Sequence, residues 1–247
     1  QKIRTRFTTE VPGSKDLNFR WLMVRRDGVP WVGPTPDYDR LLAPNESQEF
    51  TPGLNLVLSE GELERLRAMT VRADRQEIWQ AELNEIRTST ESIMDATVPR
   101  YSLYVPTRYG RSGEEPRREF DLALRAALAG LVARDDDLMR FAARQAIRLA
   151  LIEFWKEGFV SHFRGSDWGH SAFAENQGNI RSALLLDFCW HCLSPDGRAL
   201  IAQAIREKGL VNLQCSEAVA NQGVRFHRGL LLGQLALSQA GLGKPMS

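Results

Sequence analysis

Most of the chain is a run of segments with helical periodicity, separated by recognisable helix start and stop signals. Residues 59–62, Ser-Glu-Gly-Glu, fit a capping box, in which a hydroxyl and a glutamate three residues later satisfy free N–H groups at a helix start. Ser194 followed by Pro195 marks another helix start, and Gly209 lies just past the expected end. We therefore expect a mainly α protein, with helices over most of residues 59–240.

The spacing of these helices indicates hairpins. The first helical region runs from Ser59 to about Met94 and can break near Asp74. Further helices are expected over residues 116–133, 138–157, 176–192, 194–209 and 216–240. Most connections are short, so neighbouring helices should be antiparallel. Since no fixed repeat length is visible, the pairs favour part of an α/α-toroid over a repeat solenoid.

The first 58 residues have a different character. They hold six prolines, and residues 17–24 partly alternate apolar and polar side chains before the turn signal Asp27-Gly28. We expect a short β-rich or irregular lead-in over 1–58, followed by a helical domain over 59–247 that is an incomplete toroid.

Composition limits the partners. The 32 lysines and arginines nearly cancel the 31 aspartates and glutamates, so no overall field attracts nucleic acid or an anionic membrane. No apolar stretch reaches the roughly 20 residues that span a bilayer. Cys189 and Cys192 form a C-x-x-C pair. The pair could be half of a redox or metal site, or two thiols that pack on one side of a helix. Because the sequence has no second C-x-x-C pair, we favour thiols packed in the core. We expect no metal, no cofactor and no nucleic-acid or membrane partner.

A first polar cluster lies between two expected helices, in residues 160–177. Trp168 offers a flat apolar face to a sugar ring, and amides and imidazoles supply directional hydrogen bonds. Alternatively, Trp168 covers the core and the polar groups cap the next helix. The cluster as a whole favours a binding site, formed by Trp168, His170, Glu175, Asn176 and Gln177. Tyr109, in a loop rich in Tyr and Arg, is a further candidate for stacking, or part of a solvated connection.

A second polar cluster interrupts an apolar helix at residues 221–228. Asn221, Arg225 and Arg228 are spaced at i, i+4 and i+7 and so share one helix face. Because unpaired polar groups are costly in a buried helix, this face needs an explanation. One is a cleft wall that holds an acidic sugar, with arginines binding a carboxylate in a fork and with Gln222 beside them. The other is a salt-bridged helix end involving Glu217.

Short motifs carry a family resemblance over about residues 55–243. The start at residues 58–67, LSEGELERLR, is similar to an "LSxxELxRLR" pattern, and residues 186–198, LDFCWHCLSPDGR, are similar to "YDWL…LS…R". Residues 229–237, GLLLGQLAL, are similar to a "GLxxxALAL" finish. Together these motifs resemble the N-terminal helical domain of heparinase II/III-like polysaccharide lyases.

The resemblance implies β-elimination on an acidic polysaccharide. In such a reaction a uronate carboxylate is neutralised, a base removes the C5 proton and the 4-linked sugar leaves. Asn221 would help to neutralise the carboxylate, His227 would be the base, and Arg225 and Arg228 would bind carboxylate or sulfate. The family has Asn-Asn or Asn-His where this chain has Asn221-Gln222. The family's usual catalytic tyrosine and its C-terminal β-sandwich would fall beyond Ser247, and a periplasmic or secreted location is expected.

Two other functions fit the same sequence. One is a non-catalytic carbohydrate-binding or scaffold helical domain. The other is a glycoside hydrolase on a similar toroid, with two carboxylates flanking the bond, either Glu175 with Asp187 or Glu175 with Asp167. Only a lyase would yield an unsaturated uronate.

Overall fold

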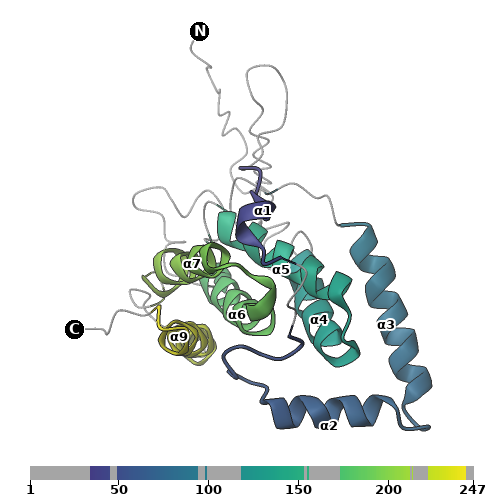
Figure 1. Cartoon of the computed structure of the whole chain (residues 1–247). Helices are drawn as coiled ribbons and strands as arrows, with labels where there is room; N and C mark the ends of the chain where they lie inside the picture. Colours follow the sequence, from purple (N-terminus) through teal and green to yellow (C-terminus); the bar gives the residue numbers. More distant parts are fainter. Residues whose placement is uncertain are drawn as a thin grey trace, which may run out of the picture.

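The computed structural model describes residues 34–44, 49–93, 98, 118–152, 155, 173–211, 213 and 222–242. The helices of these residues, which Figure 1 shows, are α1 (Tyr38–Leu41), α2 (Glu60–Thr70), α3 (Gln76–Glu91), α4 (Arg118–Ala133), α5 (Asp136–Leu151), α6 (Phe173–Phe188), α7 (Pro195–Ala204) and α9 (Gln222–Gln239). A 3₁₀ turn, Trp190–Cys192, follows α6, and a π-helical turn, Ile205–Leu210, continues α7. The expectation of a mainly helical protein is confirmed.

The predicted lead-in is irregular where the structure describes it. Residues 34–44 and 49–58 contain α1 and an isolated bridge between Leu42 and Leu193, and no strand is assigned among the described residues. The extended pieces predicted over 17–24 and 29–32 lie outside the described residues, so a β-rich lead-in stays a prediction.

Helices α4 to α9 form two layers. In Figure 1, α9, α6 and α4 lie in one row and α7 and α5 lie in a second row above it. Helices α4 and α5 make an antiparallel hairpin through a tight turn at Arg134 and Asp135. The Lys208 ammonium donates to the carbonyls of Ala150 (2.6 Å) and Ile152 (2.7 Å), so the π turn after α7 ends where α5 ends. Successive helices along the chain therefore alternate between the layers and in direction.

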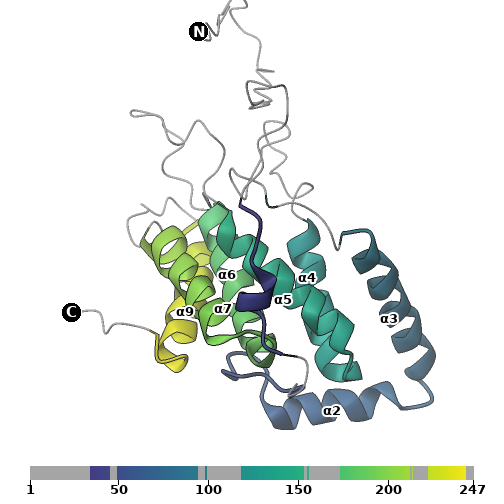
Figure 2. The ribbon, with the colours of Figure 1, turned by 45° about the horizontal axis from the view of Figure 1, so that its top comes forward.

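Helices α2 and α3 lie against the edge of this arrangement, as Figure 2 shows. The predicted capping box is present: the Glu62 N–H donates to the Ser59 hydroxyl (3.3 Å), and the Ser59 N–H donates to the Glu62 carboxylate (2.9 Å). The predicted break falls at residues 71–75. Arg67 donates to the carbonyls of Phe50 (2.6 Å) and Leu131 (2.7 Å), which attaches α2 to α4.

The core centres on α5, which is buried on nearly every side. Its alanines let neighbouring helices approach closely, and larger side chains such as Phe141 and Met139 fill the remaining space. Trp155 closes this core beyond the end of α5, because its indole N–H donates to the Leu149 carbonyl (3.1 Å).

Asp187 fixes the segment that leads into α2. Its carboxylate accepts hydrogen bonds from the backbone N–H groups of Leu54 (2.7 Å), Asn55 (3.0 Å) and Leu56 (3.0 Å). Burial raises the pKa of Asp187, and these three donors oppose the rise because they stabilise the charged form. Asp187 is thus a buried hydrogen-bond acceptor that holds the backbone of residues 54–56.

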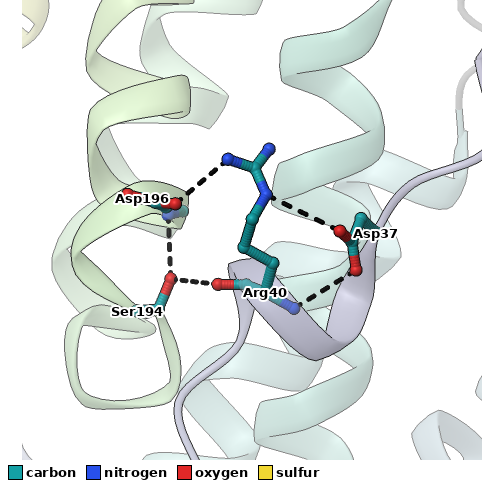
Figure 3. Close-up of polar contacts among 5 residues, drawn as sticks. Asp37, Arg40, Ser194 and Asp196 are labelled. Carbon is teal, nitrogen blue, oxygen red and sulfur yellow. Dashed lines mark hydrogen bonds and ion pairs between the residues drawn. The ribbon is translucent and has the colours of Figure 1, made fainter.

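The α1 segment is attached to the start of α7, as Figure 3 shows. The Ser194 hydroxyl donates to the Arg40 carbonyl (2.7 Å), and the Arg40 guanidinium donates to Asp196 (3.0 Å). The Ser194 N–H also donates to the Leu41 carbonyl (3.1 Å). Leu41 and Leu42 are buried, so this segment is anchored by both polar and apolar contacts.

Several helix limits differ from the sequence-based expectation. Helix α6 begins three residues before Asn176 and ends at Phe188, because a 3₁₀ turn starts beyond Cys189. The segment after α7 continues through Gly209 instead of stopping before it. Gly209 is needed there for close packing against α6, so it does not act as a helix terminator.

Candidate functional site

The described residues of the two predicted polar clusters lie on α6 and α9, which are joined by a hydrogen bond. The Gly229 N–H of α9 donates to the side-chain carbonyl of Asn176 in α6 (3.0 Å). A methyl group on Gly229 would lie 2.5 Å from that oxygen and 2.8 Å from the Asn176 backbone carbonyl. Only glycine lets the two helices approach this closely.

Asn179 continues this contact one helical turn along α6. It is completely buried, and it packs between Gly209 of the π turn and Gly233 of α9. A methyl group on Gly209 would lie 1.8 Å from the Asn179 carbonyl oxygen, and one on Gly233 would lie 3.2 Å from its amide nitrogen. Neither amide atom of Asn179 has a hydrogen-bond partner among the described residues. The seam between the helices is therefore closely packed at this level.

Three polar side chains near the start of these two helices are exposed to solvent. Gln177 of α6 and His227 and Arg228 of α9 are exposed. The first turn of a helix also presents free N–H groups and the positive end of the helix dipole. Because α6 and α9 run in the same direction where they touch, both helix starts lie at the same end of the pair. The arrangement suits an anionic ligand, because amide, imidazole and guanidinium groups all donate hydrogen bonds to a carboxylate or a sulfate.

The remaining predicted site residues divide into two groups. Glu175 and Asn176 are buried, and Asn176 uses its side-chain oxygen to accept from Gly229, so their role as ligands of a sugar stays a prediction. Their burial follows from the packing of α6 against its neighbours. The backbone of Gln222 and Arg225 belongs to α9, and their side chains are not described. Asn221, Trp168, His170 and Tyr109 lie outside the described residues.

Asp187 does not suit the role of a hydrolase acid. Its carboxylate is buried and is used by the backbone of residues 54–56, so it is not open to a glycosidic bond. Asp167, the other acid considered with Glu175, lies outside the described residues. The burial of Asp187 does not favour the Glu175–Asp187 pair for glycoside hydrolysis, and that alternative stays a prediction.

The C-x-x-C pair is buried. Cys189 and Cys192 are free thiols beside the 3₁₀ turn. Burial raises the pKa of Cys192 to about 12 and raises that of Cys189 well above the usual value of a thiol. Such thiols are poor nucleophiles, which agrees with the packing interpretation. In the described ranges, no three His, Cys, Asp or Glu side chains gather as a metal site would require.

A column of arginines on α5 was missed at the sequence level. Arg140, Arg144 and Arg148 follow one another at i, i+4 and i+8, a spacing that alone would have placed them on one helix face. Arg148 is buried and its guanidinium donates to Gln145, while Arg144 lies over the ring of Tyr38 in α1. The spacing of the arginines can be read from the sequence, but the contact of α1 with them is visible only in the structure.

Comparisons with protein families, curated proteins and solved structures find no match to this chain. The likeness to heparinase II/III-like lyases therefore rests on the short motifs of the sequence and stays a prediction. Among the helices of the described residues, none combines the length and the apolar character that a membrane crossing needs.

Proposed function

We propose that this protein is part of a polysaccharide lyase of the heparinase II/III-like kind, which cleaves uronic-acid-containing glycans by β-elimination. In this proposal the two helical layers belong to an α/α-toroid. The acidic polysaccharide binds where α6 and α9 begin, and the protein acts in the periplasm or outside the cell.

The alternation of α4, α5, α6, α7 and α9 between two layers supports the toroid. Each helix that follows along the chain runs opposite to the last and lies in the other layer. This is the pattern expected when helical hairpins are stacked side by side, whether the stack stays open or closes into a ring.

The observation that carries the proposal is the bond between Asn176 and Gly229. It joins the two helices that carry the described parts of the polar clusters, and Gln177, His227 and Arg228 are exposed on these helices. Arg228 is the exposed guanidinium of this group, and it would bind a carboxylate or sulfate of the glycan.

The chemistry assigns distinct tasks to the residues of α9 and its start. Asn221 donates a hydrogen bond to the uronate carboxylate, which makes the C5 proton more acidic. His227 removes that proton, the C4–C5 double bond forms, and the C4–O4 bond breaks. The leaving oxygen takes up a proton, so the products are an unsaturated uronate and a new sugar end.

The test measures binding and cleavage separately on uronic-acid polysaccharides, with heparin as the first probe. Cleavage is followed by the ultraviolet absorbance of the unsaturated product, and binding by calorimetry. We expect Arg228→Ala to weaken binding by about tenfold, since a charge-assisted contact is lost. Arg75→Ala removes an exposed arginine next to α3, far along the chain from the seam, and is the matched control.

The possible results separate the functions. An absorbance rise that His227→Ala or Asn221→Ala abolishes supports the lyase. Binding that depends on Arg228 without any absorbance rise supports the non-catalytic carbohydrate-binding alternative. No binding, or binding that Arg75→Ala and Arg228→Ala weaken equally, contradicts a glycan site on this seam.

A further inference from the structure

The arginine column of α5 is a second concentration of positive charge, separate from the α6–α9 seam. Arg140, Arg144 and Arg148 are spaced four residues apart, so their side chains follow one another along the helix at intervals of about 6 Å. No ion pair found among the described residues involves Arg140 or Arg144. Within the part of the chain that the structure describes, the guanidinium groups of Arg140 and Arg144 thus have no carboxylate in ion-pair distance.

The α1 segment covers this column. The Arg144 guanidinium lies 4.7 Å from the centre of the Tyr38 ring, and the Arg140 guanidinium donates to the Ala43 carbonyl (3.4 Å). Burial raises the pKa of the Tyr38 hydroxyl, and the charges of Arg148 and Arg144 oppose that rise. Tyr38 therefore lies close to two of the three arginines.

The two ends of the α1 segment are attached with different strength. Leu41 and Leu42 are buried, and the backbone there is bonded to Ser194 and Cys192. The part around Tyr38 depends on contacts between exposed groups: Arg40 pairs with Asp37 and Asp196, and those three side chains are each more than half exposed. Exposed ion pairs are weak and are screened by salt, so this end is the one that can move.

We infer that the α5 arginine column is a binding subsite for an acidic polysaccharide, and that Tyr38 occludes it until the ligand displaces the ring from Arg144. Repeated carboxylates or sulfates along an extended glycan match a line of guanidinium groups. The two aspartates that flank Tyr38, Asp37 and Asp39, are exposed and bring negative charge to this segment. The choice of ligand rests on the proposed function, whereas the occlusion rests on the contacts of Tyr38.

The experiment is a mutant cycle on the full chain with heparin as the probe and neutral dextran as the control polymer. Tyr38→Ala should raise heparin affinity about threefold to tenfold, because the cost of displacing the ring is gone. Tyr38→Phe keeps an aromatic ring over Arg144 and should retain the original affinity. Arg144→Ala should reduce affinity strongly in the Tyr38→Ala protein but weakly in the original one, where the column is covered.

Each alternative outcome overturns the inference. Unchanged affinity in Tyr38→Ala, with helical content preserved by circular dichroism, shows that the ring occludes nothing. An equal effect of Arg144→Ala in both backgrounds shows that the column is already open. If duplex DNA binds the Tyr38→Ala protein as tightly as heparin does, the arginine column is not a polysaccharide subsite. Arg228→Ala, measured alongside, reports on the α6–α9 seam alone, so failure of one site is distinguishable from failure of the other.

Discussion

At the residue scale, the seam between α6 and α9 depends on glycines that face asparagines. Asn176 and Asn179 project from α6 towards Gly229 and Gly233 of α9, and Gly209 of the π turn completes the contact. Asn176 uses its carbonyl for a backbone N–H, while Asn179 is buried without a hydrogen bond among the described residues, which is unfavourable on its own. Close helix packing must compensate for that cost.

Gly209→Ala tests this packing. The new methyl group would lie 1.8 Å from the Asn179 side-chain oxygen, so the variant should lower the free energy of unfolding by about 2 kcal/mol. Urea denaturation followed by circular dichroism measures the change. Gly61→Ala is the matched control, since nothing lies within 4 Å of its added methyl group and helix propensity should make it slightly stabilising.

A double variant separates the clash from a general intolerance of alanine at Gly209. If the Asn179 side chain is the obstacle, Gly209→Ala should cost much less in an Asn179→Ala background. Equal costs in both backgrounds would show that the asparagine–glycine contact is not what requires glycine there.

The cysteines allow a second prediction at this scale. Burial raises the pKa of Cys192 to about 12, so at pH 8 almost none of it is thiolate, and burial also raises the pKa of Cys189 well above its usual value. Iodoacetamide at pH 8 should leave both thiols unmodified in the folded protein and modify both in urea, as peptide mass spectrometry would measure. Rapid modification of either one in the folded protein would contradict the buried positions.

At the element scale, helix starts are the features that the sequence predicts best. The signals at Ser59 and Ser194 are local, because the capping hydroxyl and its N–H partner are three residues apart. Helix ends are less predictable. Gly209 is the residue type that commonly ends a helix. Its role here is set instead by Asn179, which is thirty positions earlier in the chain and adjacent only in the folded protein.

Ser194→Ala tests the link between α7 and α1. The Ser194 hydroxyl accepts from the Gly197 N–H (3.1 Å) and donates to the Arg40 carbonyl (2.7 Å), so its loss should destabilise the protein by about 1 kcal/mol. It should also speed hydrogen exchange at the amides of residues 41–43. Ser59→Ala is the control, because it removes a helix cap that has no contact with α1. If both variants speed hydrogen exchange in residues 41–43 equally, the link between α7 and α1 is refuted.

At the scale of the whole molecule, the periodicity of the sequence predicts helices and hairpins but not how the hairpins are stacked. The two layers depend on contacts between residues far apart in the chain, such as Lys208 with the end of α5 and Gly229 with Asn176. The sequence identified residues 160–177 and 221–228 as two separate polar clusters; that Asn176 of the first bonds to Gly229, next to the second, follows only from the fold.

The same limit explains why the burial of two acidic residues could not be predicted. Glu175 and Asp187 are acidic and sit in helices with polar neighbours, which made them candidates for catalysis. Their burial is a consequence of the surrounding helices and of the backbone of residues 54–56, and no local pattern reveals it. Exposed residues such as Arg228 remain candidates because the packing leaves them at the surface.

The most direct test of the account is hydrogen exchange of the full chain with and without heparin, resolved by peptide. The account predicts slower exchange, on adding heparin, at the starts of both α6 and α9, residues 173–177 and 222–229, because the ligand covers the seam that Asn176 and Gly229 form. Protection that leaves both segments unchanged, or that is confined to α2 and α3, would contradict it.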